Sequence, residues 1–256
     1  MKALFTQITD GLGRWFLFVT QTIVWSFRPP FRWRHSFKQL EFIGVQSIPI
    51  IMLTGLFTGM VFALQAGKTL TLVKMETLTG ATVGLSLTRE IAPVFTALMV
   101  TARVCSSMAA EIGSMKVTEQ IDALYAMAVE PLQYLVVPRV IGCLLMLPLL
   151  TIIFDFIGTI GSYLVGVFLL QIPPGPFLDK LYWYVDVDDV MGGLIKASVF
   201  GFFIALISCF QGFFAEGGAE GVGRATTRSV VISSVTVLVT DYFLTTWILE
   251  FFTHNR

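Results

Sequence analysis

Five long apolar runs, separated by shorter polar segments, dominate the pattern of the chain. Each run is long enough to cross a bilayer, which takes about 20 helical residues, and too apolar for a helix that faces water. We predict an all-α integral membrane protein whose transmembrane helices span residues 43–64, 82–102, 140–170, 192–214 and 229–252. The third run would be on the order of 45 Å long as a helix. A single helix that tilts, kinks at Pro148 or projects beyond the membrane fits that length best.

The first 40 residues have a different pattern, and we predict that they form an interfacial elbow segment ahead of a transmembrane domain at 41–256. Apolar residues recur there at helical spacing, namely Ile8, Leu12, Trp15, Val19 and Ile23. An amphipathic helix of this kind is typical of segments that lie in the membrane interface. Basic and aromatic residues at 28–35 are expected at the level of the lipid headgroups on the cytoplasmic side. The alternative is a poorly ordered N-terminus.

The distribution of Lys and Arg predicts the orientation in the membrane. Of the 17 basic residues, two lie inside predicted spans, and only Lys68, Lys74, Lys180 and Arg256 lie on the side opposite the N-terminus. Because short cytoplasmic connections are enriched in Lys and Arg, we expect the N-terminus in the cytoplasm and the C-terminus outside. The Asp-rich loop 171–190 then faces outwards.

Composition narrows the function classes. Hydrophobic residues make up 55% of the chain and charged residues 13%, about half the charged share of a typical soluble domain. The 17 acidic and 17 basic residues cancel, so no net field would attract nucleic acid. The cysteines have no metal-ligand spacing, and Gly67-Lys68-Thr69 lacks the first glycine of a phosphate-binding loop. With no catalytic constellation in the sequence, we expect neither an enzyme nor a bound metal or cofactor.

Small residues recur at four-residue spacing in two of the spans. This spacing lets helix backbones approach closely, so we expect these spans to pack tightly, with a homodimer as one candidate interface. The residues are Gly55, Gly59 and Ala63 in the first span and Gly158, Ser162 and Gly166 in the third. The glycine-rich run 217–223 is expected to be a flexible loop between helices.

Five ionisable residues lie inside predicted spans: Arg89, Glu90, Asp155, Lys196 and Asp241. Each would cost several kcal/mol facing lipid, so each should face a partner, water or a ligand. One interpretation is a set of internal ion pairs, such as Lys196 with Asp241 or Glu90, that hold the bundle together. A second is the polar floor or rim of an outward-opening cavity for an anionic headgroup. A third is a relay of carboxylates in an ion-coupled secondary transporter, although the inverted repeats typical of that class are absent.

The connection between the second and third spans predicts a helix over about 109–125, which Pro131 would end. Its apolar stripe consists of Val117, Ile121, Leu124 and Ala128, and polar residues cover the rest. Such a helix can lie on the membrane or insert into a groove of a partner protein.

The segment from Glu111 to Leu124, EIGSMKVTEQIDAL, closely resembles the cytoplasmic loop of the MlaE/YrbE family, the permeases of MCE-associated ABC transporters. Three further stretches are similar to the family in matching order. They are the Arg-Glu and proline of 87–93, Pro138-Arg139 followed by 147–151, and 223–231 with Asp241 downstream. The resemblance covers roughly residues 35–252.

This resemblance implies a homodimeric, multi-pass permease of the bacterial inner membrane that moves phospholipid. It also implies a cytoplasmic ABC ATPase that holds the ATP and Mg, a periplasmic MCE-domain protein, and a small STAS-like accessory subunit as a further candidate partner. The coupling helix that docks on the ATPase would include Glu111, Lys116, Glu119, Gln120, Asp122 and Leu124. The lipid cavity would lie beside Arg89, Glu90, Lys196 and Asp241.

Overall fold

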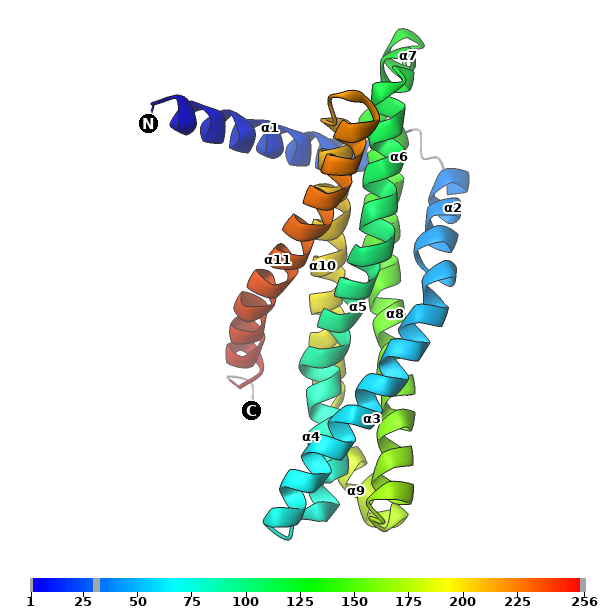
Figure 1. Ribbon diagram of the computed structural model, residues 1–256, viewed down its shortest axis with the longest axis vertical. Helices are drawn as coiled ribbons and strands as arrows, with labels where there is room; N and C mark the ends of the chain where they lie inside the picture. Colours follow the sequence, from blue (N-terminus) through cyan, green and yellow to red (C-terminus); the bar gives the residue numbers. More distant parts are fainter. Residues whose placement is uncertain (1, 30–32, 254–256) are drawn as a thin grey trace.

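The computed structural model describes residues 2–29 and 33–253, which form helices joined by short connections (Figure 1). In chain order the α-helices are α1 (Lys2–Ser26), α2 (Trp33–Ile43), α3 (Ile48–Leu72), α4 (Thr79–Ser86), α5 (Ala92–Val100), α6 (Ser106–Val117), α7 (Gln120–Ala126), α8 (Val137–Tyr163), α9 (Pro174–Tyr184), α10 (Val187–Phe213) and α11 (Gly218–Thr253). Shorter segments join several of these into longer helices: the 3-10 turns η1 (Val45–Ser47) and η2 (Glu76–Leu78), and the π-helical η3 (Leu87–Ile91), η4 (Thr101–Cys105), η5 (Leu132–Val136) and η6 (Leu164–Leu169).

Within the described part of the chain, five helices are long and apolar enough to cross a membrane. They cover His35–Leu72, Glu76–Val117, Leu132–Leu169, Val187–Phe213 and Gly218–Ile248. No strand occurs in residues 2–29 or 33–253. The prediction of an all-α membrane protein with about five spanning helices is therefore confirmed.

The helices extend beyond the apolar runs that predict them. The second one covers 42 residues, Glu76–Val117, whereas the apolar run covers only 82–102. At ~1.5 Å per residue it is about 60 Å long, roughly twice the thickness of the hydrocarbon core. Hydropathy marks only the part that would lie in lipid, whereas backbone hydrogen bonds continue the helix at both ends. The fifth helix likewise begins at Gly218, so most of the glycine-rich run is helical rather than a loop.

The packing of α3 against α8 depends on the absence of side chains. A methyl group at Gly59 would overlap the carbonyl oxygen of Gly158, and one at Gly161 would overlap that of Leu56. Gly55 is buried on the same side of α3. Gly55 and Gly59 of the first stripe therefore face Gly158 of the second within one chain, where they let the helix backbones touch, whereas Gly166 lies against Phe177 of α9. The structure thus gives them an intrachain role instead of the homodimer contact considered from the sequence.

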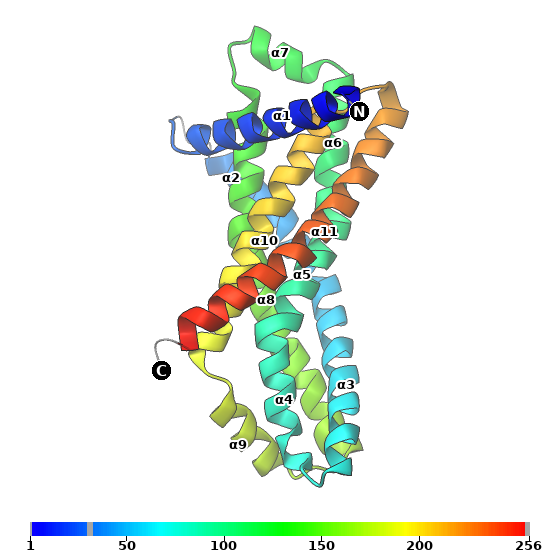
Figure 2. The same ribbon diagram turned by 90° about the vertical axis from the view of Figure 1, so that its left-hand side faces the viewer.

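Helix α1 lies across one end of the bundle, roughly at right angles to the spanning helices (Figures 1 and 2). The rings of Trp15 and Phe18 lie edge-on to that of Phe210, with centroids 5.0 and 5.5 Å apart. Phe16 and Leu17 remain exposed, as expected for a helix in the membrane interface. The predicted stripe residues Ile8 and Leu12, and Arg256 at the C-terminus, lie outside the residues whose side chains the structure describes.

Two short helices mark opposite ends of the molecule: α7 at the end that carries α1, and α9 at the other (Figures 1 and 2). Helix α9 occupies the segment 171–190 that was predicted as a loop. It buries Phe177 against Gly80 of α4 and leaves Tyr182 and Trp183 almost fully exposed. Exposed aromatic rings of this kind are enriched at membrane–water interfaces.

Candidate functional site

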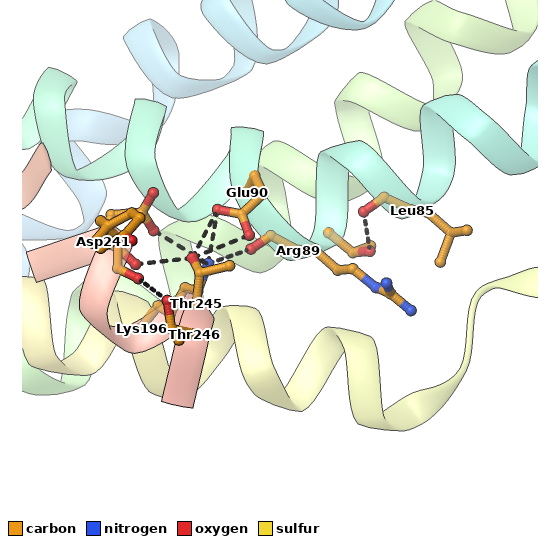
Figure 3. A network of polar contacts seen from close by, with 9 residues as sticks. Leu85, Arg89, Glu90, Lys196, Asp241, Thr245 and Thr246 are labelled. Carbon is orange, nitrogen blue, oxygen red and sulfur yellow. Dashed lines mark hydrogen bonds and ion pairs between the residues drawn. The ribbon is translucent and has the colours of Figure 1, made fainter. Parts of the chain in front are cut away.

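A polar cluster joins three of the spanning helices (Figure 3). Nζ of Lys196, on α10, lies 2.8 Å from Oε2 of Glu90 on η3 and 3.2 Å from Oδ1 of Asp241 on α11. It also donates to the hydroxyl of Thr245 at 2.7 Å. The Lys196 side chain is only 3% exposed, so its ammonium has exchanged water for protein oxygens, as a buried charge requires.

The backbone supplies another oxygen atom to the same lysine. Nζ of Lys196 donates to the carbonyl of Arg89 at 3.0 Å. In a regular α-helix that carbonyl would accept the N–H of residue 93, but Pro93 has none. The chain is π-helical over Leu87–Ile91, a distortion frequent at functional sites. Pro93 therefore frees a carbonyl that the lysine occupies.

A glycine sets the approach of α10 to this segment. Gly193 lies one turn before Lys196 and is buried. A methyl group there would overlap the carbonyl oxygen of Thr88. Because Gly193 has no side chain, α10 comes close enough to η3 for Lys196 to reach the Arg89 carbonyl.

The guanidinium of Arg89 points away from the cluster (Figure 3). Its Nη2 lies 2.8 Å from Oδ1 of Asp189, near the start of α10. Asp189 also accepts the backbone N–H of Asp186 at 3.0 Å, as part of a capping box. The spacing of the two aspartates could have predicted this cap. Nothing in the sequence pointed to Arg89 as a partner, because it lies 100 residues away.

These contacts decide how each charge can act on a ligand. The ammonium of Lys196 has three N–H donors and already faces four oxygen atoms of the described residues. It can bind a phosphate only by giving up a partner. Arg89 is 43% exposed and is the accessible cation of the site. Glu90, 41% exposed, presents a carboxylate beside it.

Asp155 on α8 lies apart from this cluster. Its Oδ1 is buried and has no hydrogen-bond partner among the described residues. No described hydrogen bond or ion pair joins Asp155 to Glu90 or Asp241. A relay through all three carboxylates would need such a link, whereas the ion pairs of Lys196 with Glu90 and Asp241 are both formed.

The segment predicted as one coupling helix over 109–125 is divided in the structure. Residues up to Val117 continue the second spanning helix as α6, and α7 begins at Gln120. Between them Glu119 has a φ of 58°. A left-handed residue cannot continue an α-helix, so the chain turns at this point. No sequence signal marks the turn, because residues other than glycine and asparagine rarely adopt this conformation.

The predicted coupling residues are accordingly separated. Glu111 lies inside α6, where its Oε2 is 2.6 Å from Nη2 of Arg139 on α8. Lys116 reaches across the turn to Asp122, with Nζ and Oδ1 3.1 Å apart. The Lys116–Asp122 pair therefore ties α7 to the end of α6, and Glu111 instead fastens α6 to α8.

Helix α7 itself presents most of its surface outwards. Ile121 is buried and Leu124 is half-buried, so these two residues anchor it, while Glu119 and Gln120 are exposed. Partial burial raises the pKa of Tyr125 above its ordinary value, and the negative charges of Glu130 and Asp122 raise it further. The exposed phenol can donate a hydrogen bond to a partner.

The three cysteines pack inside the helix bundle. Cys105, Cys143 and Cys209 are buried thiols, and Cys105 lies 2.9 Å from the hydroxyl of Ser229 on α11. No group of three or more His, Cys, Asp or Glu side chains in residues 2–29 and 33–253 is arranged to hold a metal ion. The Gly67-Lys68-Thr69 sequence lies within α3.

Comparison with known proteins identifies relatives over nearly the whole chain. A family model described as Permease MlaE matches residues 36–247. A probable ABC transporter permease protein of Rickettsia bellii is 43% identical over 239 residues, which cover 93% of this chain and 92% of that protein. A probable ABC transporter permease protein of Synechocystis is 43% identical over 216 residues, covering 84% and 82%. The chloroplast protein TRIGALACTOSYLDIACYLGLYCEROL 1 of Arabidopsis thaliana is 34% identical over 230 residues, covering 90% and 66%. The matched region contains both the Lys196 cluster and α7, and the chain belongs to the MlaE permease family.

Proposed function

We propose that this protein is the membrane-spanning subunit of an ABC transporter that moves phospholipid between a bacterial inner membrane and an MCE-domain partner. The relatives named probable ABC transporter permease proteins support the transporter class. The observation that carries the proposal is the cluster around Lys196, because ionisable residues inside spanning helices typically mark substrate pathways. Energy would come from a separate ATPase subunit that holds the ATP and Mg.

In this proposal the lipid phosphate binds Arg89. A guanidinium binds phosphate through two parallel N–H bonds. Asp189 engages Nε and Nη2 of Arg89, and the exposure of the side chain leaves its remaining N–H donors for the phosphate. Glu90, Lys196 and Asp241 hold η3, α10 and α11 together behind it. Opening these ion pairs would let α11 move relative to α10 and change the shape of the lipid cavity.

The proposed cavity is completed by a second copy of the chain. Helix α11 is the least buried of the five candidate spans, and it exposes Val235, Leu238 and Tyr242. Asp241 and Thr245 lie on the same helix and are only partly buried. A homodimer that packs through or beside α11 would place two Lys196 clusters around one cavity.

Helix α7 is the proposed coupling helix, which transmits movement of the ATPase to the permease. Its exposed surface would dock in a groove of the ATPase, on the cytoplasmic side given by the Lys and Arg distribution. One continuous helix, Glu76–Val117, leads from the α7 turn to η3. A displacement of α7 would therefore be transmitted to Glu90 along this helix. ATP binding that draws the two α7 helices together would narrow the cavity and move lipid towards or from the MCE partner.

Reconstitution tests this function directly. We expect the complex of permease, ATPase and MCE protein in liposomes to transfer fluorescent phospholipid to acceptor vesicles only with ATP. The purified permease alone should transfer none, with or without an ion gradient. Gradient-driven transfer by the permease alone would instead support an ion-coupled secondary transporter that uses intramembrane carboxylates such as Asp155.

Charge reversal on α7 tests the coupling role. We expect Glu119→Lys to lower lipid-stimulated ATP hydrolysis about tenfold, the equivalent of ~1.4 kcal/mol of docking free energy, because the exposed carboxylate would face the ATPase. Glu220→Lys, another exposed acidic residue at the same end of the molecule, is the matched control and should keep normal coupling. If the Glu119→Lys complex hydrolysed ATP as fast as the Glu220→Lys complex in the presence of lipid, the docking role of α7 would be contradicted.

A further inference from the structure

A second polar pocket lies at the end of the bundle that carries α1 and α7, well away from the Lys196 cluster. It is a cavity of about 230 Å³ between α2, α6 and the start of α8. Its polar lining consists of His35, Gln39, Glu111, Tyr134 and Arg139. The rings of His35 and Tyr134 meet edge-on, with centroids 4.8 Å apart. The proposed lipid cavity uses none of these side chains.

The arginine in this pocket has an unused donor. Arg139 is a buried cation whose side chain is 3% exposed. Its Nη1 donates to the carbonyl of Leu135 at 2.7 Å, and its Nη2 pairs with Glu111. Its Nε has no hydrogen-bond partner among the described residues, and neither has the buried Oε1 of Gln39 in the same pocket. Buried polar groups are normally satisfied, so an unmet cationic donor and an unmet acceptor in one cavity indicate a ligand.

The charges around the pocket restrict the chemistry of that ligand. Glu111 uses one carboxylate oxygen for Arg139 but is 55% exposed, so it can accept further hydrogen bonds. A simple anion would meet the Arg139 donor but would be repelled by Glu111. A simple cation would meet Glu111 and Gln39 but would be repelled by Arg139. A zwitterion with a phosphate and an ammonium group satisfies both sides.

The position of the pocket agrees with a lipid source for this zwitterion. Its residues come from the first two turns of α2, α6 from Glu111 to Met115, η5 and the first turn of α8. Helix α1 lies across the end of the bundle at which α2 and α6 are found (Figure 1). A helix lying in the interface marks the depth of the lipid headgroups. The cavity volume of about 230 Å³ is that of roughly eight waters at ~30 Å³ each, which is enough for a small headgroup.

We propose that this pocket binds the headgroup of a phosphatidylethanolamine-type lipid, with its phosphate at Arg139 and its ammonium at Glu111 and Gln39. The site would lie in the membrane leaflet on the α1 side. This proposal depends on the orientation of the protein in the membrane and does not depend on the proposed transport cycle. Because Glu111 lies on α6, which the turn at Glu119 connects to α7, the bound headgroup would contact α2, α6 and α8 close to α7. Soluble O-phosphoethanolamine carries the same chemistry and is the other source to distinguish.

Native mass spectrometry of the delipidated full-length protein tests this site. Equimolar dioleoyl phosphatidylethanolamine and dioleoyl phosphatidylglycerol are added, and the retained lipid is counted. We expect the ethanolamine lipid to be retained preferentially, and Glu111→Gln to weaken its retention about tenfold. The substitution keeps an acceptor for Arg139 and removes only the charge that would bind the ammonium. Gln39→Leu, which removes the unmet acceptor, provides a second variant should the first fail to fold.

The controls separate this site from the proposed lipid cavity. Glu41→Gln is the matched change of an exposed carboxylate on α2 that does not line the pocket, and it should leave retention unchanged. Retention that falls in Glu111→Gln and not in Glu41→Gln is assigned to this pocket, because the proposed lipid cavity is unchanged in both variants, so failure of the transport proposal would not affect the result. Equal retention of both lipids, or equal retention by Glu111→Gln and Glu41→Gln, would show a merely hydrated cavity and overturn the proposal. If the protein bound O-phosphoethanolamine but did not retain the lipid, the ligand would be a soluble molecule and the proposal of a lipid headgroup would be wrong.

Discussion

Two helix contacts in this protein are built in opposite ways. Helices α3 and α8 meet through glycines, with backbone against backbone and no charged group between the two stripes. Helices α10 and α11 meet η3 through Lys196, which is surrounded by oxygens from Glu90, Asp241, Thr245 and the Arg89 backbone. The α3–α8 contact forms because its glycines have no side chains. The contact of α10 and α11 with η3 forms through charged side chains.

The difference suggests a division of labour. A glycine contact has one close-packed geometry, because any separation of the backbones forfeits their dispersion contacts. An ion-pair cluster can exchange partners with water or ligand when the helices move, and its carboxylates are partly exposed already. We therefore expect α3 and α8 to behave as a fixed frame, and α11 as the part that moves against it.

Removing the central cation should have the largest effect. Lys196→Met leaves Glu90 and Asp241 facing each other without a counter-charge, which we expect to lower the free energy of unfolding by about 3 kcal/mol, the lower end for a broken buried pair because Glu90 is partly exposed. Thermal unfolding in detergent can be followed with a thiol-reactive dye, since all three cysteines are buried in the folded protein.

A compensated variant then separates stability from transport. Lys196→Met combined with Glu90→Gln and Asp241→Asn removes all three charges and should recover most of the lost stability. If the cluster takes part in transport, this stable variant still fails to transfer lipid. Wild-type transfer by the triple variant would reduce the cluster to a structural role.

Filling the glycine contact should have the next largest effect. Gly59→Ala places a methyl group within the backbone of Gly158 on α8, and we expect about 2 kcal/mol of destabilisation from overpacking. Gly223→Ala, where the added methyl group meets nothing within 4 Å, is the control. If the unfolding temperatures of the two variants were equal, the fixed-frame interpretation of α3 and α8 would be wrong.

A glycine at the charged contact allows a direct comparison between the two regions. Gly193→Ala meets one backbone oxygen, that of Thr88, rather than several backbone atoms, so we expect a smaller loss of about 1 kcal/mol. The displaced α10 would also weaken the bond from Lys196 to the Arg89 carbonyl. Lipid transfer should therefore fall more in Gly193→Ala than in Gly59→Ala, once both are compared at temperatures where they are folded. The reverse order would place the moving contact elsewhere.

Releasing the outer arginine should have the smallest effect on stability. Asp189→Asn keeps a hydrogen-bond acceptor for the α10 cap but removes the charge paired with Arg89. Because Arg89 is substantially exposed, we expect a change below about 1 kcal/mol in stability. If Arg89 binds the lipid phosphate, its release should raise the affinity for phospholipid two- to threefold, measured as lipid retention. Weaker retention would indicate that Asp189 holds Arg89 in its binding position.

The sequence by itself determined the class of the molecule and the existence of its five spanning helices. Both depend on hydropathy and composition, which are properties of one segment at a time. The matching motifs around residues 89 and 120 also sufficed to indicate the family, because their order along the chain needs no folding to be recognised. Helix ends were predicted less well: Glu76–Val117 is twice as long as its apolar run, since backbone hydrogen bonding continues where hydropathy no longer gives a signal.

Only the tertiary structure decided which residues meet. Whether Gly59 faces Gly158 or a second chain, and whether Arg89 belongs with Lys196 or with Asp189, depends on the rotation and depth of helices far apart in the sequence. The break at Glu119 was equally hidden, because no residue type in this stretch favours a left-handed conformation, and the burial of Ile121 and the Lys116–Asp122 pair beside it are visible only in the folded chain. Each of these features is a relation between segments, and the free energy that selects it exists only once the helices are packed together.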